Sequence, residues 1–156
     1  MWLPISGLVD PNIRFYMPNA DTTLVIPSCA ASVITASTYS TFNNSLYINS
    51  GRGYTRNGLI KPDFAAPGVQ LTTAIPGGTY STITGSCAAS ALTAGAAALF
   101  VEGGLRGEIS RYFTPAEVKS LFLRGTQRSS IYNYPNREWG YGTMNVYETF
   151  ESFLRS

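Results

Sequence analysis

Residues 85–99 read GSCAASALTAGAAAL and form the densest run of Ala and Gly in the chain. Ala and Leu favour helix, while Gly85 and Ser86 supply a turn and an N-cap. We therefore predict a helix over residues 88–100 that begins at or beside Cys87. Because small residues occupy every face of this helix, we also predict that it is central and buried.

Cys87 falls in the first turn of the predicted helix, where backbone N–H groups are unpaired and the helix dipole favours a thiolate. A nucleophile there would be activated in part by its position. The alternative is a helix that serves only for packing, with Cys87 as a small apolar filler. The helix alone does not separate these two interpretations.

The composition describes one domain with a modest surface charge. The chain has 156 residues, of which 44% are apolar and 13% are charged, and a chain of this size buries roughly 70% of its unfolded surface. The net charge is +2 and basic residues do not form a run, which argues against a nucleic-acid partner. We expect no membrane span, because the Ala-rich stretch is weakly hydrophobic and interrupted. Two Cys residues make no disulfide framework and leave the compartment open.

Strand and turn signals dominate the first half of the chain. Residues 32–39 read SVITASTY, which predicts a buried strand of a parallel sheet over residues 32–38. Residues 1–27 mix apolar pairs with Pro, Gly and Asn and predict short strands and loops. Asp63 stands beside Pro and apolar residues, where a carboxylate is costly to bury unless backbone N–H groups donate to it. We interpret Asp63 as structural.

Helix signals dominate the last third. Thr114-Pro115-Ala116-Glu117 is a capping box with Pro at the first helical position, and Gly125 is the predicted stop of the helix that follows. Residues 102–107 are rich in Gly and predict a solvent-facing loop. The final stretch of the chain, up to Leu154, predicts a short amphipathic helix.

Four segments in the same order resemble the subtilisin-like serine proteases (subtilases): residues 26–39, residues 49–68 (NSGRGYTRNGLIKPDFAAPG), residues 85–99, and residues 132–148 with their WGYG motif. In subtilases the third of these segments carries the nucleophilic Ser, and Cys87 occupies that position. The closing segment looks most like clostridial and gut-bacterial subtilases, including the Csp group linked to spore germination. The resemblance begins at residue 26, leaves residues 1–25 as entry strands and loops, and corresponds to the C-terminal half of the catalytic domain.

The resemblance implies an α/β fold, the C-terminal portion of a parallel sheet flanked by helices. It also implies acyl transfer on a peptide or protein substrate, with Cys87 at the nucleophile position and its backbone N–H as an oxyanion donor. The chain contains no His, so the general base must lie elsewhere. We therefore expect the triad Asp and His and the oxyanion Asn in an upstream half outside these 156 residues, and no activity from the chain alone. Asn19 lacks the family context of the oxyanion Asn, and we interpret it as a loop residue.

Several alternatives remain open at this stage. Cys in place of Ser fits an engineered substitution, a natural variant, or a non-catalytic pseudoprotease that acts in binding or in spore-germination signalling. Cys29 is interpreted as a buried filler, although a disulfide between Cys29 and Cys87 is an open possibility. A half-domain would leave apolar surface uncovered, so we expect self-association or a complementary segment. No residue pattern argues for a cofactor or a metal ion.

Overall fold

A parallel strand pair forms the centre of the fold. The computed structural model describes residues 7–106 and 112–154. β1 (Ala36–Ser40) pairs in parallel with β3 (Phe64–Pro67), so that Ala36 lies opposite Phe64, and β2 (Ser45–Leu46) joins β1 from the other side in antiparallel orientation. Phe64, Ala65 and Ala66 are fully buried. The predicted α/β class and the parallel pairing are confirmed.

The strand predicted over residues 32–38 is displaced toward the C-terminus and covers Ala36–Ser40. The reason is that side chains occupy the backbone groups of the preceding residues. The Asp63 carboxylate accepts the Thr35 N–H at 2.7 Å, and the Lys61 ammonium donates to the Val33 carbonyl. The Thr35 N–H and the Val33 carbonyl thus bond side chains rather than a strand backbone, and the only backbone bond between this segment and the β3 side is the one from the Asp63 N–H to the Thr35 carbonyl at 2.8 Å among the described residues.

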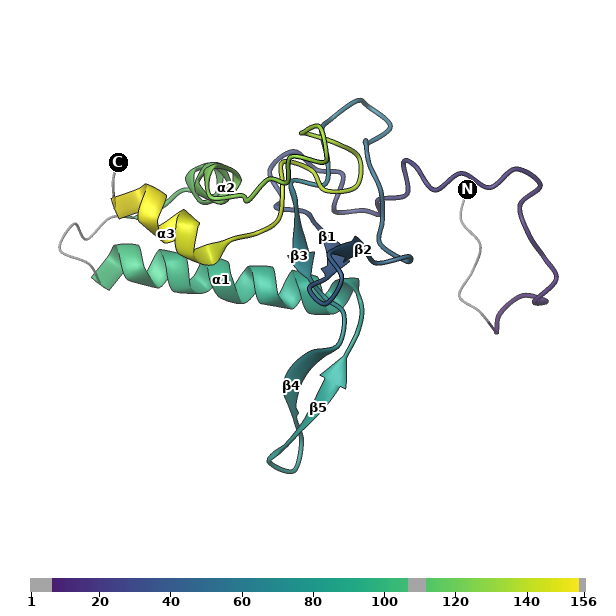
Figure 1. Cartoon of the computed structure of the whole chain (residues 1–156), viewed down its shortest axis with the longest axis horizontal. Helices are drawn as coiled ribbons and strands as arrows, with labels where there is room; N and C mark the ends of the chain where they lie inside the picture. Colours follow the sequence, from purple (N-terminus) through teal and green to yellow (C-terminus); the bar gives the residue numbers. More distant parts are fainter. Residues whose placement is uncertain (1–6, 107–111, 155–156) are drawn as a thin grey trace.

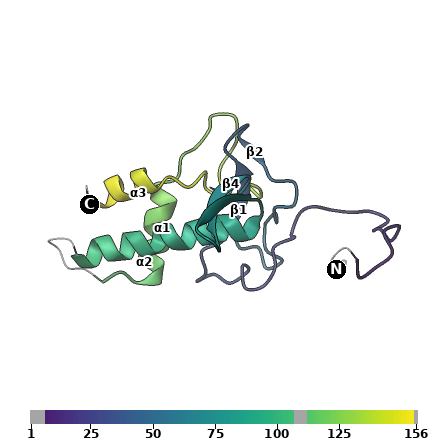
Figure 2. The same ribbon diagram turned by 90° about the horizontal axis from the view of Figure 1, so that it is seen from below.

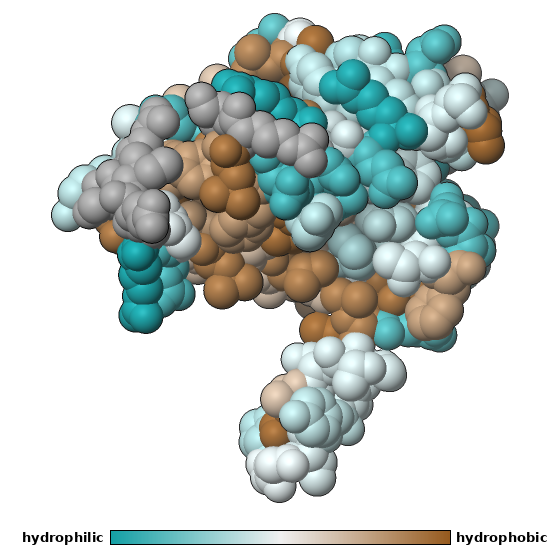
Figure 3. Space-filling view, turned by 60° about the vertical axis from the view of Figure 1, so that its left-hand side comes forward, coloured by the Kyte–Doolittle hydropathy of each residue, from teal (hydrophilic) through white to brown (hydrophobic). Residues whose placement is uncertain are grey.

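The Ala-rich helix is longer than predicted and is buried on one side only. α1 spans Ser86–Arg106 and begins one residue before Cys87. Its buried residues follow one stripe: Ala88, Ala89, Thr93, Ala96, Phe100 and Gly104. Leu92 and Leu99 on the outer side are 42% and 60% exposed, so the prediction of burial on every face is wrong for the described chain. Figure 3 shows this apolar surface in brown, above the projecting hairpin.

The predicted loop over residues 102–107 is also wrong, because residues 102–106 continue α1; Gly107 lies outside the described residues. Gly103 and Gly104 are needed for packing rather than for a turn. A Cβ on Gly104 would lie 2.1 Å from Phe113, and one on Gly103 would lie 3.2 Å from Phe150. The two glycines therefore let aromatic rings from the rest of the chain approach the helix backbone.

By length and composition α1 could cross a membrane, with a mean hydropathy of 1.4 over its best window. The Ala-rich stretch is therefore longer and more apolar than the reason given for expecting no membrane span assumed. Core helices pass the same test, and α1 packs against β1, β3 and α2. These contacts favour a core helix of a folded domain.

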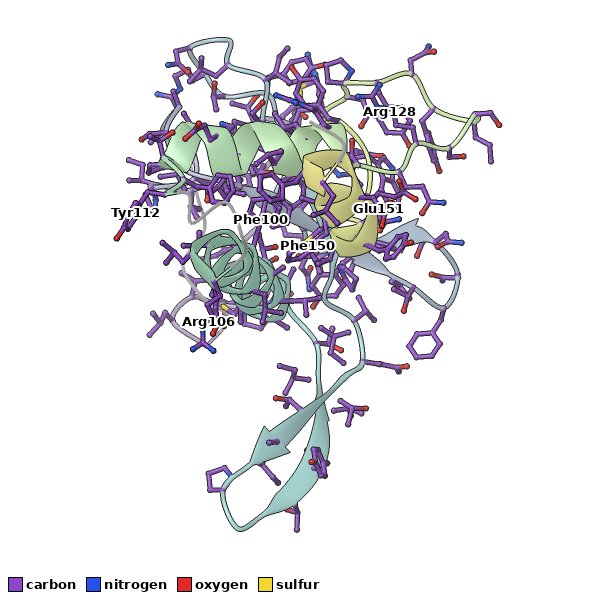
Figure 4. All side chains as sticks on the ribbon, turned by 90° about the vertical axis from the view of Figure 1, so that its left-hand side faces the viewer. Phe100, Arg106, Tyr112, Arg128, Phe150 and Glu151 are labelled. Atoms are coloured by element: carbon purple, nitrogen blue, oxygen red, sulfur yellow. The ribbon has the colours of Figure 1, made fainter. Side chains whose placement is uncertain are left out.

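Two further helices complete the core. α2 (Pro115–Arg124) begins at the capping box of Thr114 and Glu117 and ends at Gly125, as predicted, and α3 (Val146–Leu154) is the predicted C-terminal helix. Phe100 of α1 is the hub of an aromatic cluster, with ring centroids 5.0 Å from Phe113 and 5.1 Å from Phe150. Figure 4 labels Phe100 and Phe150 and shows both between the helices.

The closing segment is tied to β3. The Ala65 N–H donates to the Gly142 carbonyl at 2.9 Å, and the Tyr141 N–H donates to the Asp63 carbonyl at 2.9 Å. A Cβ on Gly140, whose φ is +54°, would lie 2.3 Å from the Pro62 carbonyl oxygen. The first glycine of the WGYG motif therefore permits a close backbone approach.

Two parts extend away from this core. β4 (Leu71–Ile75) and β5 (Thr79–Ile83) form an antiparallel hairpin that projects below α1 in Figure 1 and is exposed throughout β5. The first described residues form an extended N-terminal arm on the opposite side of the molecule from α3, as Figures 1 and 2 show. Residues 7–25 contain turns but no strand, so the predicted entry strands are absent from the described part of that segment. Residues 1–6 lie outside it.

Candidate active site

Cys87 lies at the edge of the sheet where the parallel strands end. β3 ends at Pro67, and the next residue, Gly68, accepts the Gly85 N–H at 2.8 Å and donates to the Tyr39 carbonyl at 3.1 Å. These bonds join the ends of β1 and β3 to the turn that opens α1. In open α/β sheets ligands bind at this carboxyl edge.

Gly68 allows an unusually close crossing at this point. A Cβ there would lie 2.5 Å from the Thr38 methyl group and 2.9 Å from the Gly85 carbonyl oxygen. No other residue type fits without moving the helix or the strand. The Ala-Pro-Gly part of the motif over residues 49–68 thus positions the start of α1.

The Cys87 side chain is exposed and its thiol is free. The Gly85 carbonyl accepts the Ala88 and Ala89 N–H groups at 3.1 and 3.4 Å. These two bonds form the first turn of α1, which contains Cys87. Within the described residues the Cys87 N–H has no acceptor. A thiol and a backbone donor are therefore presented together toward solvent at the helix N-terminus.

Cys29 is a half-buried free thiol whose Sγ donates to the Leu24 carbonyl at 3.5 Å. Both cysteines are free, so the structure contains no Cys29–Cys87 disulfide. The filler interpretation of Cys29 fits this environment.

A cavity of about 440 Å³ lies beside Ser86, the residue before Cys87. Its wall combines aliphatic side chains with small polar ones: Leu24, Val25, Ile48, Ser28, Thr35, Ser50 and Ser86. No sequence pattern indicated this cavity, because its walls come from four separate segments of the chain. Ligand sites are concave and mostly apolar with a few polar groups, and this cavity near the exposed Cys87 thiol has that character.

Asp63 lies at the other end of β3, about 13 Å from the Cys87 edge for a four-residue strand. It is 2% exposed, and its carboxylate contacts the Lys61 ammonium at 2.6 Å and the Lys119 ammonium at 2.9 Å. Burial lowers the pKa of Lys61, which Asp63 opposes and Lys119 reinforces. Asp63 therefore joins the start of β1, the start of β3 and α2. This geometry supports the structural interpretation.

Asn19 lies in an exposed turn, where its side-chain oxygen accepts the Asp21 N–H at 2.8 Å. This matches the expected loop residue. Across residues 7–106 and 112–154, no group of three His, Cys, Asp or Glu side chains could hold a metal ion.

Comparison with known proteins decides the family. The model of the subtilase family (peptidase S8) matches residues 12–142. The chain belongs to the subtilase family. Among solved subtilase-fold structures, the CspB protease of Clostridium perfringens is 31% identical, with a TM-score of 0.86 over 92% of this chain and 31% of the CspB chain. This similarity agrees with the likeness of the closing segment to Csp-type subtilases.

More distant subtilase-fold structures show the same architecture. The prenylagaramide maturation protease PagA is 19% identical with a TM-score of 0.68, covering 85% of this chain and 46% of PagA. The S218A mutant of the PatA protease domain is 22% identical with a TM-score of 0.71, covering 88% of this chain and 46% of PatA. This subtilase chain thus spans less than half the length of each of these three structures. No curated protein matches it.

Proposed function

We propose that this chain is the nucleophile-bearing, C-terminal part of a subtilase-type endopeptidase. The single observation that carries the proposal is the position of Cys87. It is an exposed thiol in the first turn of α1, held at the carboxyl edge of the strands by Gly68 and Gly85. The family resemblance assigns the nucleophile to this residue.

The proposed chemistry is acyl transfer. The Cys87 sulfur forms a bond to the carbonyl carbon of a peptide, while a general base takes the thiol proton. The Cys87 N–H donates to the oxygen on which negative charge develops. The base then returns its proton to the leaving amine as the C–N bond breaks, and water hydrolyses the resulting thioester.

The base and its partners come from outside this chain in this proposal. No His occurs among the 156 residues, and Asp63 is fully engaged at the opposite end of β3. The uncovered apolar side of α1 supports a complementary upstream segment that completes the domain. A chain without that segment has no route for the thiol proton and should not turn over peptides.

A peptide-hydrolysis assay on four proteins tests the proposal. These are the full-length protein with Cys87, its Cys87→Ser and Cys87→Ala variants, and the present chain alone. We expect hydrolysis from the full-length protein with Ser at this position and poor turnover with Cys87, because sulfur is a larger atom in a site shaped for oxygen. Losing the nucleophile or base costs about 10⁶-fold in subtilisin, so Cys87→Ala and the isolated chain should be inactive.

Activity of the isolated chain would contradict the proposed mechanism. A full-length protein that keeps an upstream Asp and His, yet is inactive with either Cys or Ser at residue 87, would support a pseudoprotease that acts by binding. The two functions are thereby separated by one set of assays.

A further inference from the structure

A second concave site lies on the same subtilase chain, separate from the cavity beside Ser86. It has a volume of about 640 Å³ and lies between the turn after β1 and the loop that follows α2. Figure 2 shows this loop rising beside β2. We call it the Arg128 pocket; its main lining residues are Tyr39, Asn44, Gln127, Arg128, Tyr132 and Trp139.

Internal contacts hold the walls of the Arg128 pocket in place. The Tyr132 ring stacks on the buried Trp139 ring with centroids 5.7 Å apart, and Tyr39 packs on the same ring at 5.6 Å. The backbones of Gln127 and Thr143 exchange two hydrogen bonds of 2.9 Å. A pocket built this way requires little ordering when a ligand binds.

Some polar side chains of the pocket, such as Asn43, Tyr134 and Thr143, are hydrogen-bonded to neighbouring residues, and others have no partner within the described chain. Arg128 is the only charged residue in the lining. Its Nε donates to the Tyr141 carbonyl at 2.9 Å, which orients the guanidinium and leaves its two amino groups without a partner in the described residues. The side-chain amides of Asn44 and Gln127 have no hydrogen bond there either. Figure 4 shows Arg128 on the loop beyond α2, apart from the aromatic cluster.

A fixed guanidinium with no carboxylate in its pocket favours an anionic ligand, and its planar fork matches a carboxylate. Amide and tyrosine side chains around it suit a polypeptide, since they provide apolar contact together with adaptable hydrogen bonds. The charge and the lining therefore both describe a peptide segment that carries a carboxylate.

The Arg128 pocket is connected to the nucleophile edge. Tyr39 lines the pocket and its carbonyl accepts the Gly68 N–H at 3.1 Å, while the Gly68 carbonyl accepts the Gly85 N–H at 2.8 Å. We propose that the Arg128 pocket is an exosite that binds a carboxylate of the substrate polypeptide, with Arg128 as its counter-ion. This inference rests on the proposed function for the nature of the ligand.

The test measures binding separately from cleavage. The affinity of full-length protein with Cys87→Ala is measured for fluorescent peptides that are otherwise neutral and carry a single Glu at successive positions. The same peptides with Gln in place of Glu, and versions with a free or an amidated C-terminus, are measured alongside. We expect a peptide with a carboxylate at one position, in a side chain or at the C-terminus, to bind about 5-fold more tightly than its neutral counterpart, as for an exposed ion pair. The preference should decrease in 1 M salt.

Variants assign the preference to one residue. Arg128→Gln should remove it and Arg128→Lys should retain part of it. Arg124→Gln is the matched control, because Arg124 is an exposed arginine at the end of α2 and does not line the pocket. It should leave the preference unchanged.

Equal binding of carboxylate and neutral peptides, or a preference that survives Arg128→Gln, would overturn the exosite even if the protein cleaves peptides. A carboxylate preference that depends on Arg128 in a protein that cleaves nothing would support the exosite and contradict the proposed protease activity.

Discussion

The contacts of Asp63 could be predicted only in part from the sequence around it. The IKPD segment indicated a carboxylate that needs donors, and the Thr35 N–H is such a donor. The two lysines that flank it could not be inferred. Lys119 lies 56 positions further along the chain, and only the packing of α2 brings its ammonium within 2.9 Å of the carboxylate.

Replacing Asp63 with Asn should destabilise the fold strongly. The change leaves the buried Lys61 ammonium without its counter-ion, and removing one partner of a buried ion pair costs about 3–5 kcal/mol. Urea denaturation measures the loss. Asp21→Asn is the control, because Asp21 pairs with Arg137 at the surface, where an ion pair contributes at most about 1 kcal/mol. Equal losses in the two variants would contradict the role assigned to Asp63.

Tyr39 makes the stability depend on pH in the alkaline range. Burial raises the pKa of Tyr39 above 10.0, so above about pH 10 the unfolded chain releases a proton that the folded chain retains. The folded state binds more protons there, and the free energy of unfolding falls as pH rises. Tyr39→Phe should reduce this fall between about pH 9.5 and 11. Tyr80→Phe, at a 76% exposed hairpin residue, should follow the unmodified protein in thermal denaturation.

At the scale of elements, the sequence predicted helix limits correctly where local signals set them, and wrongly where contacts between distant segments set them. The capping box at Thr114 and the stop at Gly125 gave α2 its correct limits, because both act through adjacent backbone groups. The glycines at 103 and 104 indicated a loop, yet they lie in α1 since Phe113 and Phe150 pack against them. The start of β1 was misplaced because the side chains of Lys61 and Asp63 hold the residues before it.

The junction between β3 and α1 provides a test at this scale. Gly68→Ala should move the start of α1 away from the strands, because the new Cβ would lie 2.9 Å from the Gly85 carbonyl oxygen. We expect the free energy of unfolding to fall by about 1–3 kcal/mol from overpacking. We also expect the rate of peptide hydrolysis by the full-length protein to fall, because Cys87 moves with the start of α1. Gly95→Ala is the matched control, since nothing lies within 4 Å of its Cβ position. In the chain alone it should stabilise α1 by up to about 1 kcal/mol.

At the scale of the whole molecule, the place of Cys87 at the start of α1 could be predicted and its surroundings could not. Cys87 was located by a continuous motif whose helix and turn form locally. The cavity beside Ser86 and the Arg128 pocket are each lined by residues from separate segments, and no pattern along the chain reports which segments meet. The exposure of one side of α1 could not be predicted either, because Ala and Leu indicate a buried helix whether or not another segment covers that side.

The exposed side of α1 leads to a prediction about association. Leu92 and Leu99 are 42% and 60% exposed on a helix with no charged residue before Glu102, and burying a leucine contributes about 1.5–3 kcal/mol. The chain alone should therefore self-associate through this side, and Leu92→Gln with Leu99→Gln should weaken the association by about tenfold or more. Sedimentation velocity over a range of concentrations measures it. Leu154→Gln removes a 72% exposed leucine from α3 and should have little effect. If the double variant associates as strongly as the unmodified chain, or if the full-length protein associates through the same leucines, α1 is not the surface that an upstream segment covers.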